Sequence, residues 1–105
     1  LQASQVWHAL RRIFPEATSV VVMPDHIHIL LPSTDECDRT RAQLLGVMGS
    51  VSRRTGLPHL WQALGQPRPV NNRDHLRRTL RYTFLNPCRA HLVRDPLEWP
   101  WSTYR

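Results

Sequence analysis

The sequence predicts an α+β domain of the ferredoxin-like kind, an antiparallel sheet with helices on one side. Three observations predict it: apolar residues at helical spacing open the chain, two short β-branched runs follow, and two more helical segments come later. The expected order is helix, strand, strand, helix, strand, helix, the ferredoxin-like pattern without its first strand. We therefore expect one domain over residues 1–105 that lacks this strand and leaves sheet edges unpaired.

The first helix and the strand pair follow from periodicity. Residues 1–14 carry one apolar stripe at helical spacing, and Pro15 ends it. The run 19–23 is typical of a buried strand. Pro24-Asp25 interrupts the run, and an extended pattern resumes over 26–31, so we expect a hairpin.

The second half supplies the remaining elements. An apolar face from Leu44 to Val51 predicts the second helix. The stretch 60–70 could form a third strand, but its prolines confine it to an edge or an irregular path. Asn71 or Asn72 can cap the third helix, which Asn86-Pro87 should disturb because the residue before proline avoids the helical region.

Charge points to a polyanion. All 14 basic residues are Arg, and the formal net charge is +6. Residues 1–38 hold two Arg and five acids, a net of −3, whereas residues 39–105 hold twelve Arg and three acids, a net of +9. Such asymmetry favours a nucleic-acid partner, although an arginine-rich composition also follows from a GC-rich genome.

Cellular location is inferred from what the sequence lacks. It contains no apolar run long enough for a membrane span and no leader-like pattern. Its two cysteines form no metal-knuckle motif. We therefore expect a cytoplasmic protein with no membrane partner.

His26 and His28 are candidate metal ligands. Residues two apart on a strand point to the same face, with backbones about 7 Å apart, so both imidazoles can converge on one ion. Ile27 and Ile29 then point to the opposite face. The competing interpretation is two ordinary histidines on a solvated sheet face.

Tyr82 and Asn86 are four residues apart and share one face of the third helix. A phenol is a poor nucleophile near neutral pH and needs an activated electrophile such as a metal-bound phosphate. The Asn86 amide oxygen suits Mg²⁺ or Mn²⁺. The alternative is a half-buried packing tyrosine and a helix-terminal asparagine.

Arginines and a tryptophan are candidate DNA contacts. Guanidinium groups reach two phosphate oxygens at once, and an indole can stack on an unpaired base. A solvated helix face and a packing tryptophan are the alternatives. The candidates are Arg77, Arg78, Arg81, Arg89 and Trp61.

Four segments together resemble one family. They are the strand pair 21–31, the stretch 59–62, the helix 80–93 and the tail 95–105. In order and spacing they resemble the single-tyrosine HUH transposases, in particular the REP-associated tyrosine transposases of bacteria. The resemblance extends over nearly the whole chain.

The resemblance implies a specific chemistry. His26 and His28 would bind Mg²⁺ or Mn²⁺, with Asn86 completing the ligand set, and Tyr82 would attack single-stranded DNA beside a hairpin-forming repeat. The product would be a 5′-phosphotyrosine link and a free 3′-hydroxyl, as in DNA transposition. The helix bearing Tyr82 would act within one subunit or be exchanged in a homodimer.

Three departures from the family pattern keep alternatives open. Asp25 stands where the family usually has Asn, residues 63–69 replace a basic-aromatic pair and a regular strand, and the family's first strand is missing. A transposase remnant that binds hairpin or single-stranded DNA without cutting is therefore the second hypothesis. A ferredoxin-like RNA-binding or metal-binding regulator is the third, and it leaves the Tyr82/Asn86 pair unexplained.

Overall fold

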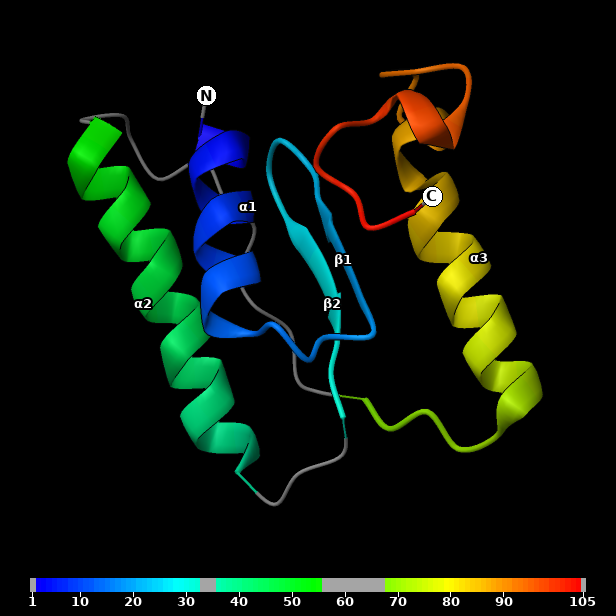
Figure 1. The fold of residues 1–105 in the computed structure, drawn as a ribbon, viewed down its shortest axis with the longest axis horizontal. Coiled ribbons are helices and arrows are strands. Elements are labelled where there is room, and N and C mark those ends of the chain that lie inside the picture. Colours follow the sequence, from blue (N-terminus) through cyan, green and yellow to red (C-terminus); the bar gives the residue numbers. More distant parts are fainter. Residues whose placement is uncertain (1, 33–35, 56–67, 105) are drawn as a thin grey trace.

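The strand β1 (Ser19–Val22) runs through the middle of the fold, and all four of its residues are buried. The computed structural model describes residues 2–32, 36–55 and 68–104. Helices α1 and α2 lie to one side of β1, and α3 lies to the other (Figure 1). The elements in chain order are α1 (Gln2–Ile13), β1, β2 (Ile27–Leu30), α2 (Cys37–Thr55), α3 (Arg73–Arg89) and the 3₁₀ turn η1 (Pro96–Glu98).

The predicted hairpin is confirmed. β1 and β2 pair in antiparallel fashion, with Val20 opposite Ile29 and Val22 opposite Ile27. The Met23 N–H donates to the His26 carbonyl at 2.8 Å, which closes a two-residue loop at Pro24-Asp25.

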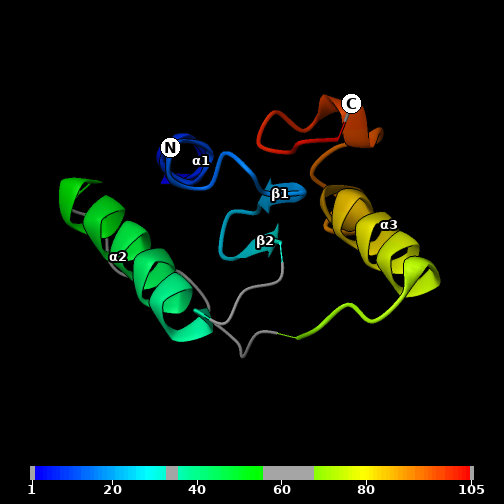
Figure 2. The ribbon, with the colours of Figure 1, turned by 60° about the horizontal axis from the view of Figure 1, so that its bottom comes forward.

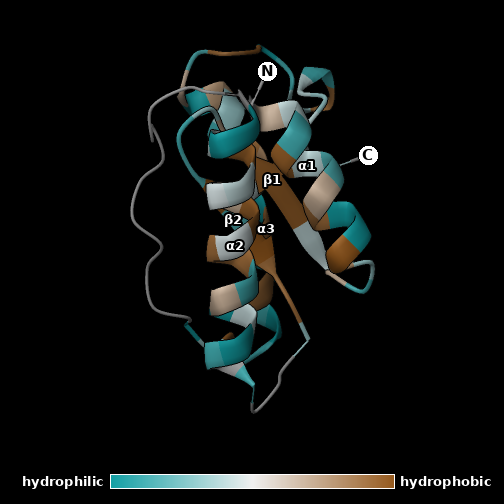
Figure 3. Cartoon of the chain, turned by 90° about the vertical axis from the view of Figure 1, so that its left-hand side faces the viewer, coloured by the Kyte–Doolittle hydropathy of each residue, from teal (hydrophilic) through white to brown (hydrophobic). Residues whose placement is uncertain are grey.

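One face of the hairpin builds the apolar core. Val20 and Val22 are fully buried and pack in a cluster with side chains of α1 and α2, such as Leu10 and Val51. Ile27 and Ile29 pack against the same cluster, so the predicted alternation along β2 holds. Figure 3 shows the hydrophobic colour concentrated on the strands behind α2. Among the described residues, no helix is long and apolar enough to cross a membrane.

The α+β fold class is confirmed, but the helices do not all lie on one side of the sheet. α1 and α2 cover the face that carries Ile27 and Ile29, whereas α3 lies beyond the opposite face (Figure 2). The physical reason is the composition of that second face. It presents His28 next to the fully buried Val21, and α3 meets it with the Tyr82 ring and the Asn86 amide.

The described part of the stretch 60–70 does not form the third predicted strand. Residues 68–70 form no strand, and residues 60–67 lie outside the described residues. The outer edge of β1 is instead covered by the C-terminal tail. The Val22 N–H donates to the Trp101 carbonyl at 2.8 Å, the Thr103 N–H donates to the Val20 carbonyl at 2.9 Å, and the Trp99 indole N–H donates to the Val22 carbonyl at 3.0 Å. Trp99 thus anchors the tail to β1.

Helix α3 starts as predicted and continues past the predicted disturbance. The Asn72 side chain accepts from the His75 N–H at 2.8 Å as the N-cap. The helix runs through Pro87 to Arg89, so the expected interruption at Asn86-Pro87 is wrong. Pro87 lies in the last turn, where it removes a single N–H bond, and its ring is fully buried.

The end of α3 forms a Schellman cap. The His91 N–H donates to the Cys88 carbonyl and the Leu92 N–H to the Pro87 carbonyl, both at 3.0 Å. This cap requires a left-handed residue, and His91 has φ 60°. A residue with a Cβ is strained there, and glycine is not.

We expect His91→Gly to raise the free energy of unfolding by about 0.5–1 kcal/mol, since the relief of left-handed strain exceeds the extra entropy of the unfolded chain. Urea unfolding followed by circular dichroism measures it. Ala90→Gly is the matched control: Ala90 has φ −82°, so the substitution should lower stability. A His91→Gly protein no more stable than the parent would contradict this account of the cap.

Candidate active site

The hairpin places two imidazoles on the face turned toward α3. His26 closes the two-residue loop, and His28 lies opposite Val21 in the middle of the hairpin. Because Ile27 and Ile29 occupy the core face, the two histidines are directed to the other face. Their ring centroids are 5.0 Å apart, and the ring planes are nearly perpendicular at 83°.

Helix α3 presents three polar side chains at helical spacing on one face. Tyr82, Asn86 and Arg89 occupy positions i, i+4 and i+7, which lie above one another on a helix. Thr83 and Pro87, one position further along, are buried and hold the helix against the rest of the fold. The polar stripe therefore lies at the boundary between the helix contact and solvent.

The two elements meet at His28. The Asn86 amide nitrogen, Nδ2, donates to the Nε2 atom of His28 at 3.0 Å. The Tyr82 and His28 ring centroids are 6.2 Å apart, edge to face at 84°. The fold thus brings together His26, His28, Tyr82 and Asn86, which are up to 60 residues apart in the sequence.

Partial burial favours the neutral form of His28. Desolvation lowers its pKa below the usual value of 6.5, and the neighbouring His26 lowers it further. A hydrogen bond received at Nε2 requires a lone pair on that atom, so the proton of the neutral ring is on Nδ1. The lone pair of Nε2 therefore faces the Asn86 side chain.

Asp25 orients His26. The Nδ1 atom of His26 donates to the carboxylate of Asp25 at 2.7 Å. Because an ionised carboxylate only accepts, Nδ1 carries the proton, and the lone pair of the neutral ring is at Nε2. In the sequence, Asp25 was notable only as a departure from the Asn that the family usually has there. Its partner could not be read from the sequence, since an adjacent carboxylate can equally point to solvent.

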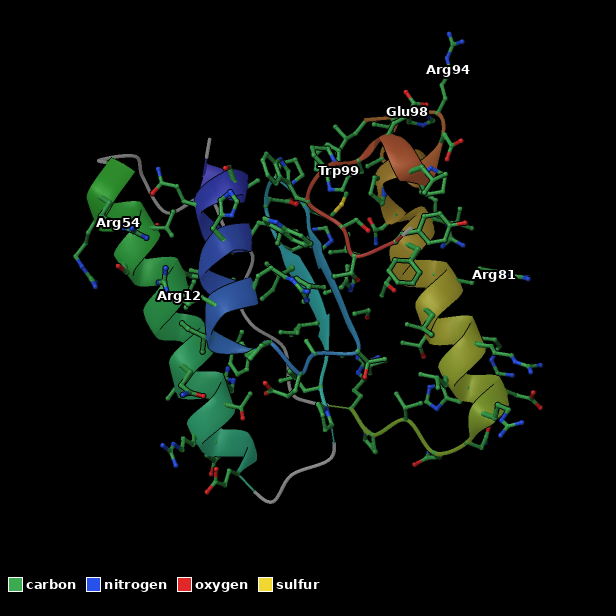
Figure 4. The ribbon with its side chains drawn as sticks, viewed as in Figure 1. Arg12, Arg54, Arg81, Arg94, Glu98 and Trp99 are labelled. Carbon is green, nitrogen blue, oxygen red and sulfur yellow. The ribbon has the colours of Figure 1, made fainter. Side chains whose placement is uncertain are left out.

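Arg89 is the one arginine of the predicted set that the structure places against Tyr82. Its guanidinium carbon lies 4.5 Å from the centre of the phenol ring, a cation–π contact. Arg77, Arg78 and Arg81 are exposed along α3, and Figure 4 shows Arg81 extending away from the sheet. Trp61 lies outside the described residues.

The donor atoms fit a hard divalent cation only if Asn86 takes part. In the described part of the chain, no three His, Cys, Asp or Glu side chains are grouped so that they could hold a metal ion. Two imidazole nitrogens and one amide oxygen would make a three-protein-ligand set with positions left for substrate. Rotation of the Asn86 side-chain amide would present Oδ1 where Nδ2 now faces His28.

The site is open rather than enclosed. Tyr82 is 50% exposed, and its ring is covered by the Arg89 guanidinium on one face. A hollow of about 640 Å³ near the end of α3 is lined by residues such as Cys88 and Glu98, and neither His26 nor His28 lines it. The group of His26, His28, Tyr82 and Asn86, which we call the Tyr82 cluster, lies on an accessible surface that a polymer can reach.

Comparison with known proteins covers sequence and structure. No protein-family model matches the chain. The curated REP-associated tyrosine transposase of Escherichia coli strain K12 is 24% identical over 89 residues, which cover 85% of this chain and 54% of that protein. A solved REP-associated tyrosine transposase, bound to a REP hairpin, superposes with a TM-score of 0.71 at 22% identity, over 98% of this chain and 63% of that one.

The chain spans about half the length of the curated relative and less than two thirds of the solved one. Two of the segments that carried the resemblance in the sequence, 21–31 and 80–93, supply the residues of the cluster around His28. In sequence and in fold, this chain is similar to the REP-associated tyrosine transposases.

Proposed function

We propose that this chain cleaves and rejoins single-stranded DNA next to a hairpin, through a covalent bond between Tyr82 and a 5′-phosphate. One observation carries the proposal: Tyr82 and Asn86 of α3 contact His28 of the hairpin, and the His28 ring lies next to the His26 ring. A protein that only binds DNA has no need of this juxtaposition. The solved relative bound to a REP hairpin supports hairpin DNA as the partner.

Cleavage would exchange one phosphate ester bond for another. The Tyr82 oxygen attacks the scissile phosphorus and loses its proton, the bond from phosphorus to the 3′-oxygen breaks, and that oxygen leaves as a 3′-hydroxyl after taking up a proton. The new phosphotyrosine ester conserves the energy of the broken bond. Attack by another strand's 3′-hydroxyl can then rejoin DNA without an external energy source.

We propose that His26, His28 and Asn86 would hold Mg²⁺ or Mn²⁺. When bound, such a cation would polarise the phosphate and offset charge that develops on its oxygens. Burial favours neutral His28, and the carboxylate of Asp25 keeps the proton of His26 on Nδ1. Once the Asn86 amide rotated to present Oδ1, the Nε2 lone pairs of both histidines could face a cation.

Arg89 would serve Tyr82 and the DNA together. Its guanidinium holds one face of the phenol ring, which limits the ring to fewer orientations. The same positive charge, next to the Tyr82 ring, would attract a phosphate that approaches the Tyr82 oxygen. Charge-assisted bonds from guanidinium to phosphate oxygens then align the phosphorus with the phenol.

We expect the purified chain, mixed with Mn²⁺ and a labelled single-stranded hairpin repeat, to form an adduct that survives denaturing electrophoresis. Tyr82→Phe removes the nucleophilic oxygen and should abolish the adduct. Tyr104→Phe is the matched control, because Tyr104 packs on Phe84 and belongs to the C-terminal tail. Hairpin binding without any adduct, across repeats from the parent genome, would reject cleavage and favour the DNA-binding remnant.

The contact between Tyr82 and His28 lies within one chain, so we propose that cleavage occurs in cis. Mixing Tyr82→Phe with His28→Ala protein should then yield no more adduct than either alone. Recovery of roughly a quarter of the parental adduct, as statistical subunit exchange would give, would show that Tyr82 is exchanged in a dimer.

Asp25 should control cation affinity through His26. We expect Asp25→Ala to weaken Mn²⁺ binding by about 10–100-fold, because the imidazole loses its orienting partner. Asp25→Asn should lose less, since the amide oxygen can still accept from Nδ1. Electron paramagnetic resonance of free Mn²⁺ measures the affinity without DNA.

Glu16→Gln controls for charge in this experiment, because Glu16 is an exposed carboxyl in the loop before β1. Equal Mn²⁺ affinity of the Asp25→Ala protein and the parent would remove Asp25 from the ligand assembly.

A further inference from the structure

A groove of about 340 Å³ lies between α1 and α2, remote from the Tyr82 cluster. We call it the α1–α2 groove. Ala9 and Val47 are buried core residues at its floor, and Ile13 borders it from α1. The groove therefore has an apolar base that cannot rearrange without disturbing the core.

The walls of the groove are positive and polar. Arg12 of α1 and Arg54 of α2 line it, together with the Gln43 and Ser50 side chains. No acidic residue lines it, and within the part of the chain that the structure describes neither arginine has a carboxylate within salt-bridge distance. Both guanidinium groups are exposed and can donate to an anion.

Gly46 lines the groove without a side chain. A Cβ atom built on Gly46 would meet nothing within 4 Å, so the α2 backbone is directly accessible at this point. A narrow chain with charged groups at intervals, such as a sugar–phosphate backbone, fits a shallow groove with cationic walls. A small apolar ligand would leave both charges unpaired.

The position of the groove decides which phosphates it can reach. Figure 4 shows Arg12 and Arg54 on the side of the molecule remote from α3, which carries Arg81. The longest dimension of the fold is 41 Å and runs from the α2 side to the α3 side (Figure 1). One turn of duplex DNA is about 34 Å long, which is comparable to this 41 Å extent. A DNA arm of about one turn that lay along this axis would therefore extend from the α3 side toward the groove.

We propose that the α1–α2 groove is a second DNA-backbone site, which holds duplex phosphates about one helical turn away from the nucleotide cleaved at Tyr82. This inference rests on the proposed function for its DNA partner. The site contributes affinity and orientation without reading bases, because guanidinium contacts to phosphates carry no sequence information.

The first test removes the two cations. We expect Arg12→Gln/Arg54→Gln to weaken binding of a hairpin with a ten-base-pair stem by about tenfold at 0.1 M salt, and to reduce the slope of log Kd against log salt by about two. Binding is measured by fluorescence anisotropy in EDTA, so that cleavage does not intervene. Circular dichroism checks that each variant is folded.

A matched control separates the site from bulk charge. Arg11→Gln/Arg53→Gln removes the same charge from the same two helices, but Arg11 stacks on Trp7 and Arg53 lies beside Gly49, outside the groove. This pair should keep the parental salt slope. Equal losses in both double variants would overturn the proposal, because they would show a non-specific field effect.

The second test blocks the groove without removing a cation. Gly46→Glu places a carboxylate between the guanidinium groups, and helix α2 tolerates it because the site is open and glycine is a poor helix former. We expect at least the loss seen with the double arginine variant. Gly46→Ala, which adds only a methyl group, should bind like the parent, and unimpaired binding by Gly46→Glu would overturn the proposal.

DNA length gives the third test. With a stem of four base pairs, the double arginine variant and the parent should bind alike, since a short arm does not reach the groove. A loss that is independent of stem length would reject the placement of the DNA. The Tyr82 adduct is scored separately: its absence would count against the proposed cleavage, whereas an unchanged salt slope would count against the groove alone.

Discussion

The alternation of side chains along β2 is the constraint on which the site depends. Ile27 and Ile29 face α1 and α2, and their burial fixes which side of the strand is inside. Because side chains alternate along a strand, the intervening His28 must then face α3. His26, just before the strand, lies on the same side. A slip of one residue would bury both imidazoles in the apolar core at a large desolvation cost. The core thus sets the orientation of the histidines.

The C-terminal tail and the capped helix α3 stabilise the part of the site that faces the histidines. Backbone bonds from Val20 and Val22 to residues 101–103 protect the outer edge of β1, which would otherwise be open to strand pairing. The Schellman cap after Arg89 extends α3 one turn past Asn86, so that Arg89 remains helical and reaches the Tyr82 ring. If the helix ended at Asn86-Pro87, Arg89 would lie outside it and would not be held on the same helix face as Tyr82.

Spacing within one element could be predicted from the sequence, and contacts between elements could not. The His-x-His strand and the i, i+4 pair on α3 each identified two residues on one face. Neither pattern says which face of α3 turns to the hairpin, because that choice depends on the burial of Thr83 and Pro87. The contact of Asn86 with His28 spans 58 residues, and the Asp25 hydrogen bond depends on one side-chain rotamer. The prediction of an interrupted α3 failed because the cost of a proline depends on its position in the helix, and Pro87 in the last turn removes only one bond.

Charge along the chain is likewise a poor guide to charge in space. The first 38 residues are net negative, yet Arg12 from this segment lies in one groove with Arg54 from the net positive remainder. The acidic residues that make this segment net negative do not line that groove. On the other side of the molecule, Arg89 lies over the phenol ring whereas Arg81, one residue before Tyr82, points away. Helix packing, which decides which residues become neighbours, therefore decides where a polyanion can bind, and the net charge decides only how strongly it is attracted from a distance.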